Sequence, residues 1–73
     1  MMETTQAIHT PFIRLDALLK LAGLAQTGGQ AKWMVLEGRV KVGGETCLQR
    51  GRKLVPGDRV EAENRTVIVR AAD

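Results

Sequence analysis

The sequence predicts an α+β domain in which two short packed helices are followed by a small, mainly antiparallel sheet of 3–5 strands. Residues 15–36 carry apolar side chains at helical spacing, and residues 39–69 contain short alternating apolar stretches separated by turn sequences. The 73 residues are enough for one domain. We place it at residues 12–73, after a flexible N-terminal arm over residues 1–11.

The first predicted helix begins at Arg14-Leu15-Asp16, after a Thr10-Pro11 step that stops any earlier helix. Asp16 would meet the positive end of the helix dipole. The apolar residues recur at helical spacing: Leu15, Leu18, Leu19 and Ala22. Gly23 can then end the helix in the left-handed conformation.

The second predicted helix begins at Thr27, which forms a capping box with Gln30. Its apolar face repeats at i, i+3, i+4 and i+7: Ala31, Met34, Val35 and Gly38. Gly38 is expected to end the helix in a left-handed conformation. Trp33 lies about 200° of helical rotation from Ala31. Either the Ile8–Phe12 segment covers this indole, which we favour, or it stacks on an exposed base.

A hairpin is predicted next, from Arg39-Val40-Lys41-Val42 through a Gly43-Gly44 turn into Glu45–Leu48. A basic loop follows at residues 49–53. Further turns are predicted at Pro56-Gly57-Asp58 and Asn64-Arg65. Strands are predicted around Val60 and Ala62 and over Thr66–Val69.

Composition argues against several functional classes. Cys47 is the only cysteine, His9 the only histidine, and the chain has no serine, so we expect no catalytic residues, no metal site, no cofactor and no small-molecule substrate. The longest internal apolar run, residues 33–36, is too short to span a membrane, and residues 1–10 lack a secretory signal pattern. We therefore expect a cytoplasmic, non-enzymatic protein that acts as a monomer.

Charge is distributed unevenly along the chain. Residues 14–53 hold eight Lys or Arg against three acids, whereas residues 54–73 hold three cations against four acids. A positive field over part of a small domain favours an extended polyanion, and nucleic acid is the leading candidate. A solvated basic face without a partner is the alternative. Arg59, Arg65 and Arg70 alternate with acids and are expected to be ordinary surface.

These segments together resemble the αL RNA-binding domain named for the small-subunit ribosomal protein "S-four", in particular its small stand-alone bacterial members. The resemblance covers roughly residues 12–62 and rests on the following sequences: Arg14-Leu15-Asp16 with Leu18 and Leu19, Gly23, Ala31, Met34-Val35, Gly38, Val40-Lys41-Val42, Gly43-Gly44 and Pro56-Gly57-Asp58. It implies binding of structured RNA, rRNA or tRNA, and a role in ribosome assembly or translation.

The chain departs from that family at Gly28, where many members carry an arginine that meets phosphate. Gly28 and Gly29 leave the backbone N–H groups of the helix start uncovered, so that they could hold a phosphate themselves. The alternative is that both glycines only permit a tight entry into the helix.

Aromatic residues make up only 3% of the chain, which excludes a platform that stacks successive bases and leaves phosphate contacts and recognition of shape. The predicted contacts are Arg14, Lys20, Gln30, Lys32, Arg39, Lys41, Arg50, Arg52 and Lys53. Gln30 has capping as its competing role. A protein-interaction module that docks on an acidic partner is the alternative function.

Overall fold

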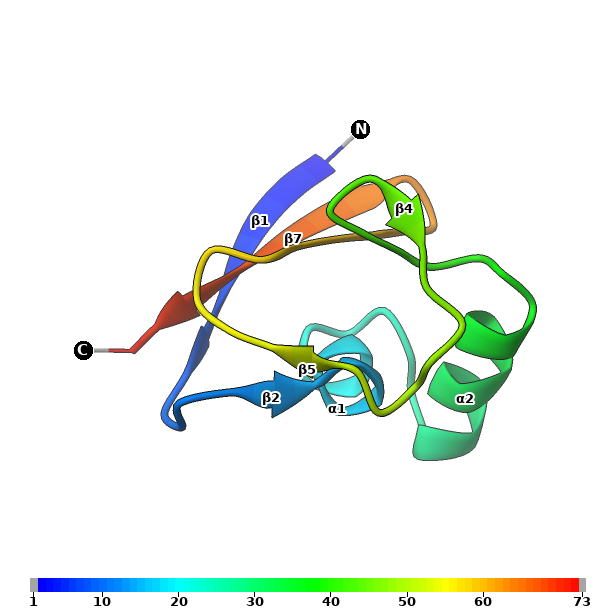
Figure 1. The fold of residues 1–73 in the computed structure, drawn as a ribbon, viewed down its shortest axis with the longest axis horizontal. Coiled ribbons are helices and arrows are strands. Elements are labelled where there is room, and N and C mark those ends of the chain that lie inside the picture. The colour runs from blue at the N-terminus through cyan, green and yellow to red at the C-terminus, as the bar shows by residue number, and fades with distance from the viewer. Residues whose placement is uncertain (1, 73) are drawn as a thin grey trace.

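The structure, a computed structural model, describes residues 2–72. The elements follow one another as β1 (Met2–Ile8), β2 (Ile13–Arg14), α1 (Leu15–Leu21), α2 (Gly28–Leu36), β3 (Lys41–Val42), β4 (Glu45–Thr46), β5 (Lys53–Leu54), β6 (Arg59–Ala62) and β7 (Arg65–Ala71). Figure 1 shows β1, β7 and β4 at the top, with the helices and the β2–β5 pair below them. The arrangement confirms the predicted α+β class.

Five strands form the larger sheet, in the order β1-β7-β6-β3-β4. Strands β7, β6, β3 and β4 pair antiparallel, whereas β1 runs parallel to β7. Strands β2 and β5 form a separate antiparallel pair. The sheet is therefore mainly antiparallel, as predicted, with the first and last strands side by side at one edge.

The core lies where the apolar faces of both helices meet the sheet. Its helical members are the residues that the spacing identified: Leu15, Leu18 and Leu19 from α1, and Ala31, Met34 and Val35 from α2. The strands contribute mostly valines: Val42, Val60, Val67 and Val69. Burial of these side chains supplies most of the stability, because each helix is too short to form alone.

Left-handed glycines occur after α2 and between β3 and β4, where the sequence predicted them. Gly38 follows α2 with φ of 74°, and its N–H donates to the Val35 carbonyl at 3.0 Å. Gly43 and Gly44 have φ of 61° and 87° and join β3 to β4. Positive φ at both central residues is the geometry of a type I′ hairpin.

The N-terminal segment differs from the expectation of a flexible arm over residues 1–11. Residues 2–8 form β1, which pairs with β7 in register from Met2 opposite Arg65 to Ile8 opposite Ala71. Ile8 is 4% exposed and belongs to the core. The residues before Ile8 are mostly polar and show no strand pattern of their own. They form a strand because they pair with β7, at the other end of the chain. The domain therefore includes β1.

The last hairpin lies one residue earlier than predicted. Glu63 and Asn64, rather than Asn64 and Arg65, occupy the turn, with φ of 54° and 62°. Strand β7 accordingly begins at Arg65 and is longer than the predicted Thr66–Val69 strand. The two-residue turn with positive φ matches the right-handed twist of β6 and β7 and so fixes this register.

Candidate nucleic-acid interface

The basic loop at residues 49–53 lies against the start of α1. The N–H of Leu15 donates to the Arg52 carbonyl at 2.8 Å, and the N–H of Asp16 donates to the Arg50 carbonyl at 2.9 Å. The first N–H groups of a helix have no partner within it, and Arg14 at the N-cap makes no side-chain cap. The loop carbonyls therefore take the place of a cap and hold three cations of the loop beside α1.

Arg14 connects this loop to the helix surface. It lies opposite Lys53 in the β2–β5 pair, and its guanidinium contacts Asp16 at 3.1 Å. It also lies over Gly51, since a Cβ there would be 3.5 Å from Arg14 Nη2. Like charges directly opposite one another on two strands are destabilising. Bound phosphate would relieve this cost.

The other half of the surface lies between the two helices. Arg14, Lys20 and Gly28 line one shallow depression, together with Asp16 and Ala17. Lys32 follows Gly28 by four residues and so projects from the same side of α2. We call six exposed side chains the basic surface: Arg14, Lys20, Lys32, Arg50, Arg52 and Lys53. They come from four separate stretches of the chain.

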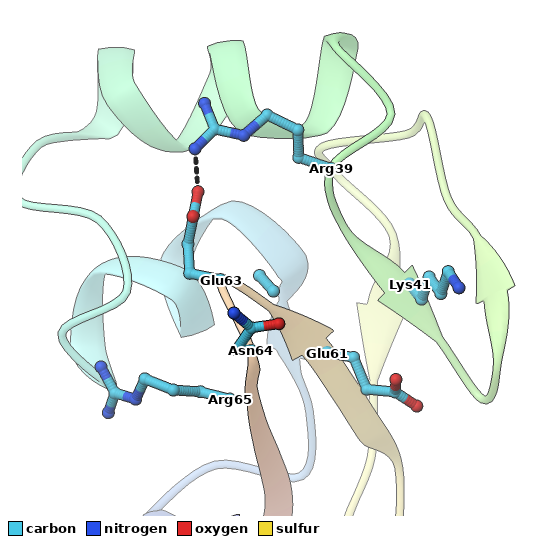
Figure 2. A pocket seen from close by; sticks show the side chains of 7 residues that line it. Arg39, Lys41, Glu61, Glu63, Asn64 and Arg65 are labelled. Atoms are coloured by element: carbon cyan, nitrogen blue, oxygen red, sulfur yellow. Dashed lines mark hydrogen bonds and ion pairs between the residues drawn. The ribbon is translucent and has the colours of Figure 1, made fainter. Parts of the chain in front are cut away.

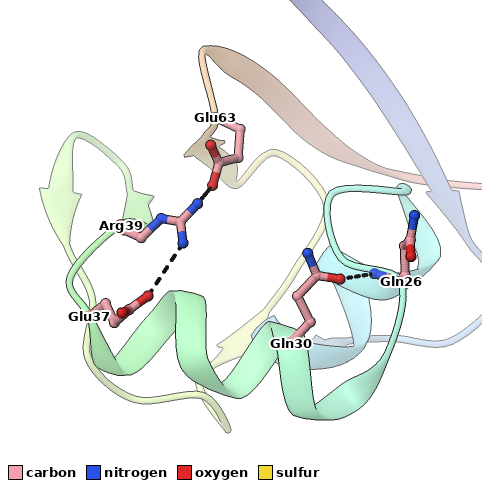
Figure 3. A network of polar contacts seen from close by, with 5 residues as sticks. All are labelled: Gln26, Gln30, Glu37, Arg39 and Glu63. Atoms are coloured by element: carbon pink, nitrogen blue, oxygen red, sulfur yellow. Dashed lines mark hydrogen bonds and ion pairs between the residues drawn. The ribbon is translucent and has the colours of Figure 1, made fainter.

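The start of α2 is capped, but not quite as predicted. Thr27 Oγ1 accepts a hydrogen bond from the Gln30 N–H at 3.0 Å, which confirms half of the capping box. The other half differs, because Gln30 Oε1 accepts from the N–H of Gln26 at 2.8 Å rather than from Thr27 (Figure 3). Gln30 therefore orders the connector before α2. Gly28 and Gly29 are both exposed beside it.

Arg39 is in a different environment from the basic surface. Its guanidinium contacts Glu37 at 3.3 Å and also pairs with Glu63 in the β6–β7 turn (Figure 3). Figure 2 shows the Arg39 side chain reaching from the chain after α2 to Glu63. The pair thus ties the end of α2 to a turn 24 residues away. Two carboxylates compete with phosphate for this side chain.

Lys41 also lies beside acids. It is opposite Glu61 in the β3–β6 register, and both residues line a depression shared with Arg39 and Glu63 (Figure 2). Opposite charges facing each other on neighbouring strands stabilise the sheet. The eight predicted cationic contacts are therefore divided: six form the basic surface, whereas Arg39 and Lys41 lie among carboxylates.

Two side chains differ from their sequence-based interpretation. Trp33 is 64% exposed, so the favoured interpretation, in which the Ile8–Phe12 segment covers it, is wrong. That segment leads from β1 to β2 instead. Arg65 is not ordinary surface, because it is half-buried and its Nη2 donates to the Ala22 carbonyl at 3.3 Å, where α1 ends.

Phe12 is a neighbour of the basic surface that the sequence did not identify. Lys53 Nζ lies 4.4 Å from the centroid of the Phe12 ring, a cation–π contact.

Within residues 2–72, no group of three or more His, Cys, Asp or Glu is placed to hold a metal ion. None of the helices in that same range is long and apolar enough to cross a membrane.

Comparison with known proteins identifies the family. A model of the S4 domain matches residues 6–70. The chain is 49% identical over 57 residues to the probable ribosome maturation protein RlbA of Bacillus subtilis, covering 78% of this chain and 80% of RlbA. It is 39% identical over 59 residues to YbcJ of Escherichia coli, covering 81% of this chain and 84% of YbcJ.

The solved structures agree with this result. The solution structure of E. coli YbcJ, described as revealing an αL motif involved in RNA binding, matches with a TM-score of 0.67 and 37% identity. The match covers 97% of this chain and 89% of the YbcJ chain. The chain belongs to the S4 domain family.

Proposed function

We propose that this S4-domain protein is a non-enzymatic, cytoplasmic RNA-binding protein. It binds structured RNA, either rRNA or tRNA, through the basic surface. It acts as a monomer, by phosphate contacts and recognition of shape, in ribosome assembly or translation. The description of the YbcJ structure supports RNA as the ligand, and the name of RlbA supports the ribosome as the setting.

One observation carries the proposal: the backbone contacts that hold residues 50–52 against the start of α1. They place the cations of the loop beside Arg14, and the depression between the helices adds Lys20 and the start of α2. Asp16 contacts Arg14 within this surface, and it is only 20% exposed. Among the ion pairs of residues 2–72, Arg14 is the only member of the basic surface, so the charges of the other five cations remain available to phosphates.

The predicted contacts outside the basic surface contribute less to RNA binding in this proposal. Arg39 and Lys41 extend the surface but bind phosphate less strongly, because Arg39 pairs with Glu37 and Glu63 and Lys41 lies opposite Glu61 on the neighbouring strand. Gln30 contributes mainly by ordering the start of α2. The backbone of Gly28 and Gly29 can approach a phosphate closely, since neither residue has a side chain in the way.

Docking on an acidic protein partner is the alternative, because the same cations would attract carboxylates. The two functions differ in the ligand that is recovered from cells. Ultraviolet crosslinking in cells, followed by sequencing of attached RNA, should recover rRNA or tRNA segments with the wild-type protein. A variant with Lys20→Ala, Arg50→Ala and Arg52→Ala should lose most of that RNA.

The control for this experiment is Arg59→Ala with Arg70→Ala, which removes two cations outside the basic surface. It should retain the crosslinks. Recovery of no RNA above background would overturn the proposal in favour of a protein partner. Equal recovery with both sets of variants would show that RNA binds elsewhere on the protein.

A further inference from the structure

Trp33 projects from the outer face of α2 with no role in the core. It is the only tryptophan of the chain and is 64% exposed, more than any other large apolar side chain of residues 2–72. We propose that Trp33 is a single-base stacking platform, which binds one unpaired base of an RNA whose phosphates lie on the basic surface. This inference rests on the proposed function and adds a specificity for RNA with a bulged or looped-out nucleotide.

The geometry of α2 leaves the indole open to a ligand. The buried face of the helix is formed by Ala31, Met34 and Val35, and Trp33 lies on the opposite side. Long helical side chains lean toward the N-terminus of their helix, over the preceding turn. Gly29, four residues before Trp33, offers no side chain there to cover the ring. A flat aromatic surface therefore remains free for a base.

The neighbouring charges indicate a nucleotide as the occupant. Lys32 is adjacent to Trp33, and Gly28, in the depression lined by Arg14 and Lys20, lies five residues earlier on the same helix. Five residues correspond to about 7.5 Å along the helix axis. The same five residues also turn by about 140° around the helix, and Lys32 lies between Gly28 and Trp33 in that rotation. Lys32 can therefore hold the phosphate of a nucleotide whose base lies on Trp33.

A protein partner would use this region differently. Leu36 is 50% exposed and lies three residues after Trp33 on the outer face of α2. An apolar protein contact would bury Leu36 together with Trp33, whereas stacking of a base requires only the aromatic ring. Leu36→Ala is therefore the matched control for Trp33→Ala, because both remove an exposed apolar side chain from one helix.

Two synthetic RNA hairpins test the proposal, one with a fully paired stem and one with a single bulged adenosine in the same stem. The chain has no tyrosine, so its ultraviolet-excited emission reports mainly on Trp33. The bulged hairpin should quench this emission, and the paired hairpin should quench it much less. Trp33→Ala should weaken binding of the bulged hairpin by about 5- to 150-fold, the range for loss of one base–aromatic stack.

Further comparisons separate stacking from charge. Trp33→Phe should retain most of the affinity, and Leu36→Ala should bind like wild type. Stacking involves no counterion release, so Trp33→Ala should leave the slope of log K against log salt unchanged. Thermal unfolding of each variant checks that it is folded.

Each alternative outcome is distinct. Strong binding of both hairpins without quenching, and without loss in Trp33→Ala, would overturn the stacking proposal and leave the proposed function intact. Equal losses in Trp33→Ala and Leu36→Ala would overturn it in favour of general apolar contact. Failure of wild-type protein to bind either hairpin would count against both proposals.

Discussion

Lys20→Ala removes one cation from the basic surface, and it should reduce the salt dependence of RNA binding by one phosphate contact. Lys20 is exposed and lines the depression between α1 and α2. The six cations of the basic surface predict a slope of log K against log salt of about −4 to −5, from −0.7 to −0.9 per contact. Lys20→Ala should reduce the magnitude of this slope by about 0.7–0.9.

The loss of affinity follows from the same relation. A single contact accounts for about a five- to eightfold change in affinity between 1 M and 0.1 M salt. Lys20→Ala should therefore bind about five- to eightfold more weakly at 0.1 M salt, and its affinity should approach that of wild type as salt is raised. Replacement by alanine keeps the helix, because alanine has the highest helix propensity.

Fluorescence anisotropy of a labelled RNA hairpin, titrated with protein at several KCl concentrations, measures both quantities. Arg70→Ala is the charge-matched control, since Arg70 is an exposed cation on β7. It should leave the slope close to that of wild type. Equal slopes for Lys20→Ala and wild type, or equal reductions for Lys20→Ala and Arg70→Ala, would refute the assignment of Lys20 to the interface.

Four changes test the fold. Leu18→Ala removes a fully buried side chain of α1 and should lower the free energy of unfolding by about 2–5 kcal/mol, measured by urea denaturation; a loss under 1 kcal/mol would contradict its place in the core. Gly38→Ala should cost about 1–2 kcal/mol because of its positive φ. Gly29 has helical backbone, and a Cβ there would make only an ordinary contact of 3.9 Å with Thr27 Oγ1. Gly29→Ala should therefore stabilise the protein by about 0.5–1 kcal/mol; if both glycine variants changed stability in the same direction, this contrast would be contradicted. Deletion of residues 2–8 should lower the unfolding temperature markedly, since the core loses Ile8 and β7 loses a neighbouring strand. An unchanged unfolding temperature would instead support the expectation that this segment is a flexible arm.

Local sequence was sufficient to predict both helices and most of the turns. The spacing of Leu15, Leu18 and Leu19 identified the buried face of α1, because every third or fourth residue of a helix shares a side. Thr27 and Gly38 marked the ends of α2 through capping chemistry that involves only neighbouring residues. The family resemblance depended on this same local pattern, which explains why the fold class was predictable.

The interface was only partly predictable, because its charge depends on contacts between distant residues. Arg39 and Arg14 look alike in the sequence, each with an acid two residues away. Only the fold brings Glu63 to Arg39 as a second carboxylate, while it brings the basic loop to Arg14. The two arginines therefore differ in their availability to phosphate for a reason that no local pattern contains.

The sequence by itself determined the elements, their buried faces and the excess of positive charge over residues 14–53, since each depends on residue type and spacing alone. The tertiary structure decided that β1 pairs with β7, that the loop at residues 49–53 caps α1, and that Trp33 faces outward. Each of these depends on where one segment lies relative to another far along the chain. Such placements are set by burial and backbone pairing of the whole domain.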